Sequence, residues 1–403
     1  MKPRVLFVLN ASGGGATQGI KEYLKYQNFQ DIDAFLVLPN EPNKGQKEWI
    51  EQFCKDYIVI SMPWWNMPNG LPWYYSWTLY IKNLIKGSFR KKGKDRIKQF
   101  AIDHGVTHIY TGSILVKEGA LAAKDLGLPH FWHIKETFGK RGRVKFPMSD
   151  RKLQRQIISF SDSVICMTEY IKSFFYHFPE NPKLKIISDG INPRDFMVDE
   201  IKGKSLREKY QVRDNEVLIG MVASFSSIWK NHKVFIEAAS LLKDVENVKF
   251  IAFGPEPKRF NNPYYNGPAN YFDTLKKYAS RLLPNGEFIW AGFHSDIPAI
   301  FNSIDIFVHP CEIEPFGRVV IEAMASSKPV VVPKSGGISE PVTSMRNGVK
   351  YEPNDAKDLS QKLRTLINTS ALRAELGKKA AEDIAASAYT LESYRKEKIK
   401  LFS

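Results

Sequence analysis

Short apolar runs alternate with longer helix-like stretches along the chain, a pattern typical of α/β proteins with parallel sheets. A first series of expected strands comprises Val5–Leu9, Ala34–Leu38, Tyr57–Ile60, His108–Tyr110, His130–Ile134, Ser163–Met167 and Lys185–Ser188. A second series comprises Val217–Val222, Val248–Phe253, Phe288–Ala291, Ile306–Val308 and Val330–Val332. Parallel sheets bind ligands at the carboxyl ends of their strands, so the loops that follow these runs are the candidate functional segments.

The two series are separated by a polar, charged stretch at residues 192–214 that contains Pro193. A chain of 403 residues suits two domains of about 200 residues each. We therefore expect an N-terminal domain over residues 1–195 and a C-terminal domain over 196–384. The last stretch, Leu372–Phe402, is helix-like and has no Gly or Pro after Gly377.

The most specific pattern lies at residues 305–341. The strand Ile306–Val308 is followed by the turn Glu314-Pro315-Phe316-Gly317, a helix from Arg318 to Ala325, a strand Pro329–Pro333 and the pair Gly336-Gly337. Glu314 and Glu322 are eight positions apart, which on a helix is roughly 12 Å along nearly the same face. The helix start between them offers free N–H groups and a positive dipole end to phosphates. By spacing alone, two solvated glutamates on one helix are the better interpretation, and the Pro-Phe-Gly turn and the Gly-Gly-x-x-Glu element shift the balance toward a binding site.

In this stretch the chain resembles the retaining glycosyltransferases of family four, which have the GT-B fold. The family motif of Glu, seven residues and Glu reads Glu314-PFGRVVI-Glu322, within EPFG, EAMA, PVV and GG-x-x-E elements in the family's order. The resemblance implies two Rossmann-like, doubly wound α/β domains facing a cleft. It also implies a C-terminal helix, about 385–403, that crosses back onto the first domain.

The resemblance also implies roles for particular residues. Glu322 would bind the donor ribose. The catalytic residues would be Glu314, which binds hydroxyls of the transferred sugar, and His133, which lies near the reacting sugar. The N–H groups near Gly317 to Val320, with Lys230, would neutralise the leaving diphosphate. The resulting substrate-binding set is Gly13, Gly14, Gly15, Ser224, Lys230, Pro315, Phe316, Gly317, Arg318, Val319 and Glu322.

Three segments outside this helix carry the other predicted site residues. Ser12-Gly13-Gly14-Gly15 follows the first strand and precedes a helix expected near Gln18. Alone, three glycines are more often a permissive turn, but the family has a glycine-rich loop here near the donor phosphates and the acceptor. His133, in Phe131-Trp132-His133-Ile134-Lys135-Glu136, ends a strand as a functional histidine of the family does. Without the resemblance, a packed strand-end histidine is the better interpretation.

The loop after Val222 departs from the family pattern. The family has a Gly-Arg pair followed by Lys-Gly, and both cations bind the diphosphate. Here Lys230 is kept, Asn231 replaces glycine, and no arginine lies between Val222 and Lys230. Ser224 or Ser226 could donate a weaker neutral hydrogen bond, or Arg318 could supply the second cation. A surface lysine is the alternative for Lys230.

Composition and charge indicate which classes of binding partner and which cellular compartment suit the chain. The net charge of +15 favours an anionic partner, which could be a phosphate, an anionic membrane or nucleic acid. The chain has no zinc-finger or RNP motif, so we expect no nucleic-acid partner. Three cysteines without paired or metal-like spacing fit a reducing cytosol, and neither a signal peptide nor a membrane-spanning run is evident.

Residues 62–98 combine Trp and Tyr with a dense basic stretch. Between Lys82 and Lys98 there are eight basic residues and one acid, Asp95. Apolar residues from Trp77 to Ile85 recur at helical spacing, which suits an anionic membrane interface. A helix docked on the domain with solvated lysines is an equal alternative. A second basic group could extend this surface: Arg141, Arg143, Lys145, Arg151 and Lys152.

These observations predict a retaining glycosyltransferase that moves a sugar from a nucleotide-diphosphate sugar to a saccharide or lipid-linked saccharide in cell-envelope polysaccharide synthesis. We expect a cytosolic protein, with attachment to the inner face of the membrane as one option. No cofactor is implied, and no metal is expected because no Asp-x-Asp motif of metal-dependent glycosyltransferases is present. Two alternatives stay open: a sugar-nucleotide epimerase of the same fold, and a non-catalytic sugar-nucleotide-binding protein, which the missing arginine favours.

Overall fold

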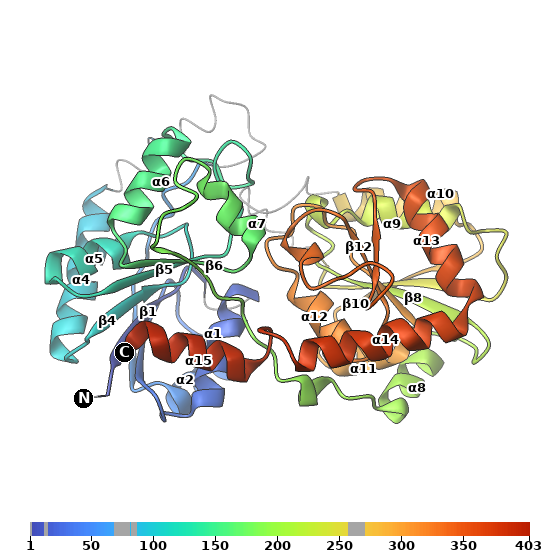
Figure 1. Ribbon diagram of the computed structural model, residues 1–403, viewed down its shortest axis with the longest axis horizontal. Helices are drawn as coiled ribbons and strands as arrows, with labels where there is room; N and C mark the ends of the chain where they lie inside the picture. The colour runs from blue at the N-terminus through green and yellow to red at the C-terminus, as the bar shows by residue number, and fades with distance from the viewer. Residues whose placement is uncertain (1, 12–14, 68–80, 82–86, 257–270) are drawn as a thin grey trace. The chain divides into compact units, whose positions relative to one another are not determined.

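A computed structural model gives the structure of the chain except for residues 1, 12–14, 68–80, 82–86 and 257–270. The chain forms two compact units. The first contains Met1–Ile191 together with Leu391–Ser403, and the second contains Asn192–Thr390. Both units are a parallel sheet with helices on its two faces (Figure 1). These are the two Rossmann-like domains that the sequence predicts.

The first unit has a seven-stranded sheet in the order β3-β2-β1-β4-β5-β6-β7. Its strands are β1 Arg4–Val8, β2 Asp33–Leu38, β3 Asp56–Val59, β4 His108–Thr111, β5 His130–Ile134, β6 Ser163–Cys166 and β7 Leu184–Ile186. Every neighbouring pair is parallel. The strand order reverses between β1 and β4, and such a switch point opens a crevice at the carboxyl ends of the strands.

Alternating side chains of β1 fix the layers of this unit. Val5 and Phe7 pack into one core with α1, α2 and α15, whereas Leu6 and Val8 pack into another with α4 and α5. Burying each of these side chains contributes about 1.5–3 kcal/mol. Because helices cover both faces of the sheet, the consecutive residues Val5–Val8 of β1 are all apolar. The helices of the unit are α1 Gly15–Gln27, α2 Lys44–Phe53, α4 Gly87–Asp103, α5 Glu118–Leu126, α6 Asp150–Ser159, α7 Glu169–Lys172 and α15 Leu391–Phe402.

The second unit has a six-stranded parallel sheet in the order β10-β9-β8-β11-β12-β13. Its strands are β8 Val217–Val222, β9 Val248–Phe253, β10 Phe288–Gly292, β11 Ile306–Val308, β12 Val330–Pro333 and β13 Val349–Tyr351. Helices α8 Glu200–Lys209, α9 His232–Ser240, α10 Tyr271–Leu282, α11 Ile297–Ser303, α12 Arg318–Ala325, α13 Ala356–Asn368 and α14 Ser370–Ala385 cover the two faces (Figure 1). The switch point lies between β8 and β11.

The strands follow the apolar runs closely, and the predicted helix Arg318–Ala325 is α12 itself. The short strand β13 was not predicted, because its three residues carry only weak periodicity. The helix-like C-terminal stretch is broken between α14 and α15. Leu391, Tyr394 and Phe402 of α15 lie in the core of the first unit.

Candidate active site

The loops after β8 and β11 bring Lys230 and Glu314 together. Lys230 ends a short 3₁₀ helix, Ile228–Lys230, and Glu314 lies in the turn before α12. The Lys230 ammonium is 2.5 Å from Glu314 Oε2, and their side chains are 21% and 15% exposed. Parallel strands β8 and β11 are neighbours, so two residues far apart in sequence meet at one sheet edge. Both side chains are partly accessible to solvent.

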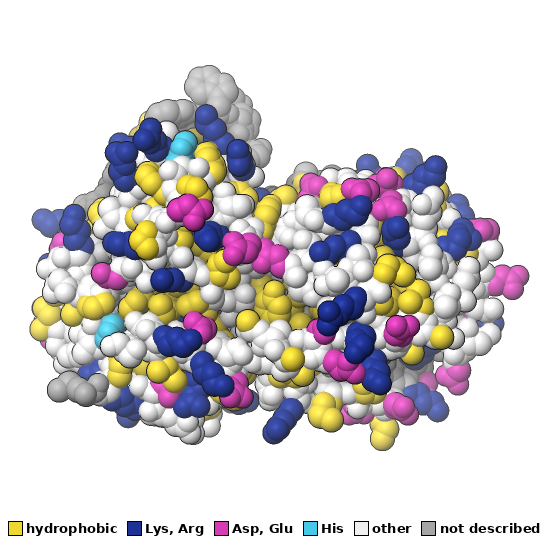
Figure 2. Space-filling model, viewed as in Figure 1, with side chains coloured by type: hydrophobic (Ala, Val, Ile, Leu, Met, Phe, Trp, Pro, Cys, Tyr) yellow, Lys and Arg dark blue, Asp and Glu magenta, His cyan; other side chains and the backbone are white. Residues whose placement is uncertain are grey.

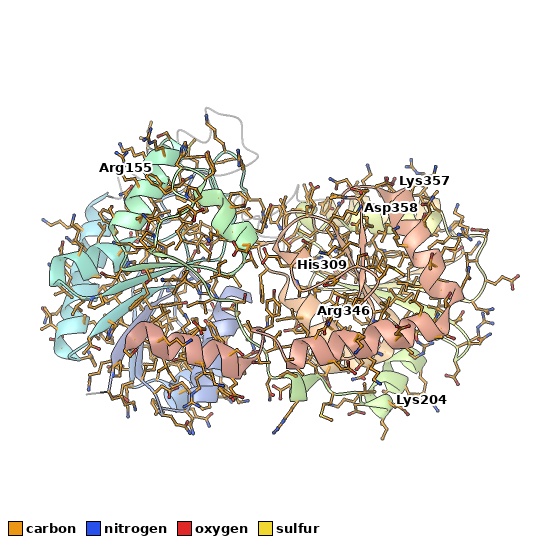
Figure 3. The ribbon with its side chains drawn as sticks, viewed as in Figure 1. Arg155, Lys204, His309, Arg346, Lys357 and Asp358 are labelled. Atoms are coloured by element: carbon orange, nitrogen blue, oxygen red, sulfur yellow. The ribbon has the colours of Figure 1, made fainter. Side chains whose placement is uncertain are left out.

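His309 directly follows β11 and approaches the same carboxylate. Its Nε2 lies 3.8 Å from Glu314 Oε2, and the side chain is buried inside the second unit (Figure 3). Burial, assisted by the Lys230 charge, lowers the pKa of His309 to about 3. A neutral imidazole therefore lies beside the ion pair. Sequence reasoning missed His309, because only the family resemblance singled out His133, and a position at the end of a strand does not by itself distinguish a functional histidine from a packed one.

The start of α12 brings Arg318 and Glu322 together. Gly317, before the first helical residue, has φ of 78°, and a Cβ there would lie 2.7 Å from the Ile338 side chain, so glycine is required. Arg318 Nε donates to Glu322 Oε1 at 2.7 Å, and both side chains are largely buried. Glu314 is thus paired with Lys230, and Glu322 is paired with Arg318. Both carboxylates are predicted to bind sugar hydroxyls, and both cations are candidates for binding the diphosphate.

The remaining predicted residues of this unit lie close to these pairs in sequence. Phe316 is buried, whereas Pro315 and Val319 are half-buried. Ser224 Oγ is 2.9 Å from Ser226 Oγ in the loop after β8. Asn231, where the family has glycine, has φ of 59° and ψ of 38°. Asparagine is among the few residues that tolerate this left-handed conformation, so the substitution preserves the backbone of the loop.

The predicted residues of the first unit are separate from this group. His133 is fully buried at the end of β5, and Tyr110 OH is 2.5 Å from its Nδ1. Burial, with Lys135 and Lys398 nearby, holds the pKa of His133 well below its usual range. Gly15 begins α1, earlier than the expected start near Gln18. Gly13 and Gly14 lie outside the described residues.

A buried ion pair accompanies His133. Lys135 Nζ is 2.8 Å from Asp189 Oδ2, and both side chains are almost completely buried. Gly19 of α1 permits this arrangement, because a Cβ at that position would lie 2.3 Å from Asp189 Oδ2. A buried charge requires its partner, so this pair fixes the chain around the end of β5. Sequence reasoning did not foresee it, since its members are distant in sequence.

A basic surface lies over α6 of the first unit (Figure 2). A pocket there is lined by Ser149, Arg151, Lys152, Arg155, Gln156 and Ser159. The three cationic side chains are exposed, as are Lys140 and Arg141 nearby. Of the aromatic and basic segment 62–98, residues 68–80 and 82–86 lie outside the described residues, whereas residues 87–98 belong to α4, where Lys94 and Lys98 both pair with Asp125. Among the helices that are described, none is long and apolar enough to cross a membrane.

Metal binding would require a cluster of acidic, histidine or cysteine side chains. Within the described ranges, no three side chains of His, Cys, Asp or Glu come close enough to hold a metal ion. Glu314 and Glu322 are each engaged with a cation instead. Metal-independent transfer stays a prediction.

Two Rossmann-like domains, with a Glu-containing helix start at the carboxyl edge of the second sheet, define a GT-B type protein. Residues 203–383 match the family described as glycosyl transferases group 1. The N,N'-diacetylbacillosaminyl-diphospho-undecaprenol alpha-1,3-N-acetylgalactosaminyltransferase of Campylobacter jejuni is 30% identical over 278 residues, which are 66% of this chain and 68% of that protein. An uncharacterized glycosyltransferase of Methanocaldococcus jannaschii is 26% identical over 374 residues, 92% and 89% of the two chains.

Solved structures show the same fold. The crystal structure of Anabaena HepE in complex with UDP superposes with a TM-score of 0.78 at 21% identity, covering 99% of both chains. The chain belongs to the group 1 glycosyltransferases, as its sequence motifs predict. It is therefore a glycosyltransferase with the GT-B fold.

Proposed function

We propose that the protein transfers a sugar, with retention of configuration, from a nucleotide-diphosphate sugar to a saccharide or lipid-linked saccharide acceptor of the cell envelope. The observation that carries the donor assignment is the pairing of Glu314 with Lys230 and of Glu322 with Arg318 around the start of α12. Two carboxylates suit sugar and ribose hydroxyls. Two cations and the positive end of the helix dipole suit a diphosphate.

In the proposed reaction the bond between the sugar C1 and the diphosphate oxygen breaks, and its electron pair leaves on the phosphate. An acceptor oxygen bonds to C1 on the same face, and its proton passes to the leaving phosphate. Lys230 and the N–H groups at the start of α12 stabilise the growing negative charge. Glu314 orients the transferred sugar, and Glu322 binds the ribose. The family resemblance assigns His133 to the reacting sugar; because this side chain is fully buried, its contact with a substrate requires movement of its surroundings.

The acceptor assignment is supported by two features. The Campylobacter relative is named for a diphospho-undecaprenol acceptor. The exposed cations on α6 suit the headgroups of an anionic membrane in which such an acceptor is anchored. We therefore propose a peripheral position at the inner face of the membrane.

A donor screen tests the proposal. Purified protein is incubated with a panel of sugar nucleotides, with and without undecaprenyl-diphosphate saccharides, and released nucleoside diphosphate is measured. Acceptor-dependent release from one donor is expected, and NMR of the product should show the anomeric configuration of the donor. Epimerised donor without acceptor would identify an epimerase instead. Neither release nor epimerisation with any donor that binds would favour the non-catalytic alternative.

A further inference from the structure

The C-terminal helix contributes a buried lysine to the surroundings of His133. Lys398 of α15 is fully buried in the first unit, and its Nζ donates to the hydroxyl of Tyr110 on β4. The same hydroxyl lies 2.5 Å from Nδ1 of His133 on β5. A hydrogen-bonded chain therefore runs from the C-terminal helix through one strand to the proposed catalytic histidine on the next.

We infer that Lys398 and Tyr110 are positioning residues that hold His133 as the neutral tautomer with its proton on Nε2. In that tautomer the imidazole offers a hydrogen-bond donor, not an acceptor, to a substrate oxygen. Because Nε2 makes no hydrogen bond with a described residue, the contact at Nδ1 decides which ring nitrogen carries the proton.

The direction of the hydrogen bonds follows from the groups present. The Tyr110 hydroxyl makes hydrogen bonds with Lys398 and His133. The Tyr394 hydroxyl also interacts with it. Burial raises the pKa of both tyrosines, and this interaction opposes the shift at Tyr110 and adds to it at Tyr394, as expected when Tyr394 is the donor. The Tyr110 oxygen accepts from Lys398, so its own hydrogen is available to Nδ1. A ring nitrogen that accepts a hydrogen bond carries no proton, and a neutral imidazole must then be protonated at the other nitrogen.

The charge of Lys398 supports the same direction. Its Nζ lies 3.7 Å from the centre of the Tyr110 ring and 5.0 Å from that of Tyr394, positions that favour an ammonium by cation–π attraction. Burial holds the pKa of Lys398 well below its usual range, although Asp189 raises it. Wherever Lys398 carries its proton, the ammonium has no lone pair, so it cannot accept from Tyr110 and the chain keeps this direction.

His133 itself is suited to a fixed tautomer. Its low pKa keeps the ring neutral over the working range, so one nitrogen is always unprotonated. Its Nε2 is buried and makes no hydrogen bond with any described residue. That nitrogen is the one left to meet a ligand, whereas Nδ1 is committed to Tyr110.

Nuclear magnetic resonance of the full chain tests the tautomer without any turnover. The protein is labelled with ¹⁵N at histidine, and the His133 signals are assigned by their loss in His133→Gln. At neutral pH we expect the wild type to show a protonated Nε2 and an unprotonated Nδ1. Tyr110→Phe and Lys398→Met should each shift the ring toward a mixture of tautomers. Tyr23→Phe is the matched control, because its buried hydroxyl makes no hydrogen bond with the described residues.

A wild-type His133 protonated at Nδ1 would overturn the inference. This measurement uses the wild type alone, so it does not depend on whether a variant folds. An unchanged tautomer in folded Tyr110→Phe would also overturn it.

The kinetic test rests on the proposed function. Tyr110→Phe should lower kcat on the order of tenfold or more, with little change in the KM for the donor, while Tyr23→Phe keeps both. A changed tautomer with unchanged kcat would overturn the positioning role and leave glycosyl transfer itself intact. A wild type without any transfer would refute the proposed function, and the NMR result would still decide the tautomer.

Discussion

The ammonium of Lys230 lies 2.5 Å from Oε2 of Glu314, across 84 positions of sequence. One group is proposed to bind the donor diphosphate and the other the transferred sugar. Each therefore neutralises the other until a ligand competes for it. Because charge-assisted hydrogen bonds contribute about 1.5–3 kcal/mol, loss of this pair offsets part of the binding free energy of the diphosphate.

Glu314→Gln should separate donor binding from turnover. It removes the carboxylate that competes for Lys230, so affinity for the free nucleoside diphosphate should stay constant or increase by up to about tenfold. Turnover should fall because the sugar loses a charged partner. Calorimetry with the free diphosphate and a transfer assay measure the two effects. Weaker diphosphate binding in a folded Glu314→Gln protein would contradict the assigned roles.

Lys230→Ala should lower turnover and diphosphate affinity together. The nucleoside without phosphates should bind equally well to variant and wild type, because its contacts exclude Lys230. Lys204→Ala on α8 is the control, since Lys204 is an exposed lysine of the same unit (Figure 3). If Arg318→Ala reproduces the loss and Lys230→Ala does not, the phosphate-binding cation is Arg318.

Glu322→Gln should weaken donor binding by about 1–3 kcal/mol, because a charge-assisted hydrogen bond to the ribose becomes a neutral one. The penalty should be absent with a 2′,3′-dideoxy nucleoside diphosphate, which lacks the hydroxyls. Glu375→Gln, an exposed glutamate of α14, serves as the control. An equal penalty with both nucleotides would mean that Glu322 acts only by holding Arg318 at 2.7 Å.

The protein should bind anionic liposomes more strongly than neutral ones, and binding should weaken with salt because screening acts over about 8–10 Å. Each cation near the surface contributes about 1 kcal/mol, so reversing Arg151, Lys152 and Arg155 to Glu should greatly reduce co-sedimentation. A matched triple reversal in the second unit, at Lys204, Lys357 and Lys378, should have less effect. Equal binding to neutral and anionic liposomes, or to neither, would favour an acceptor that is not membrane-anchored.

Acid should destabilise the fold through buried histidines. Burial lowers the pKa of His130 to about 4 and of His232 and His309 to about 3. Unfolded histidines titrate near 6.5, so below that pH the unfolded state binds more protons and stability falls as pH falls. Each contributes up to about 1.4 kcal/mol per pH unit between pH 6.5 and its folded pKa.

The measurement is the melting temperature from pH 7 to pH 4. Replacing His232 by Leu should make the decline less steep, because one proton-binding group is removed from the unfolded state. A parallel decline in wild type and variant would show that His232 does not contribute to the acid sensitivity.

Most strands and helices could be predicted from the sequence, because the signals that define them lie within the few residues of each element. Strands such as β8, Val217–Val222, are short apolar runs that must be buried on both faces, and the helix Arg318–Ala325 follows a turn rich in Pro and Gly. The end of α14 and the position of α15 could not be predicted from periodicity. A continuous helical pattern does not show that the helix is interrupted at residues 386–390. It also does not show that Tyr394, after this break, packs into the core of the first unit.

The residue types of the candidate site were determined by the sequence: Glu314 and Glu322 at helical spacing, Lys230 after a strand and His133 at a strand end. Only the tertiary structure decided their partners. The neighbouring strands β8 and β11 bring Lys230 to Glu314, and the return of the last helix buries Lys398 against Tyr110. Spacing along a chain describes one element at a time, whereas an ion pair or a tautomer depends on which elements pack together.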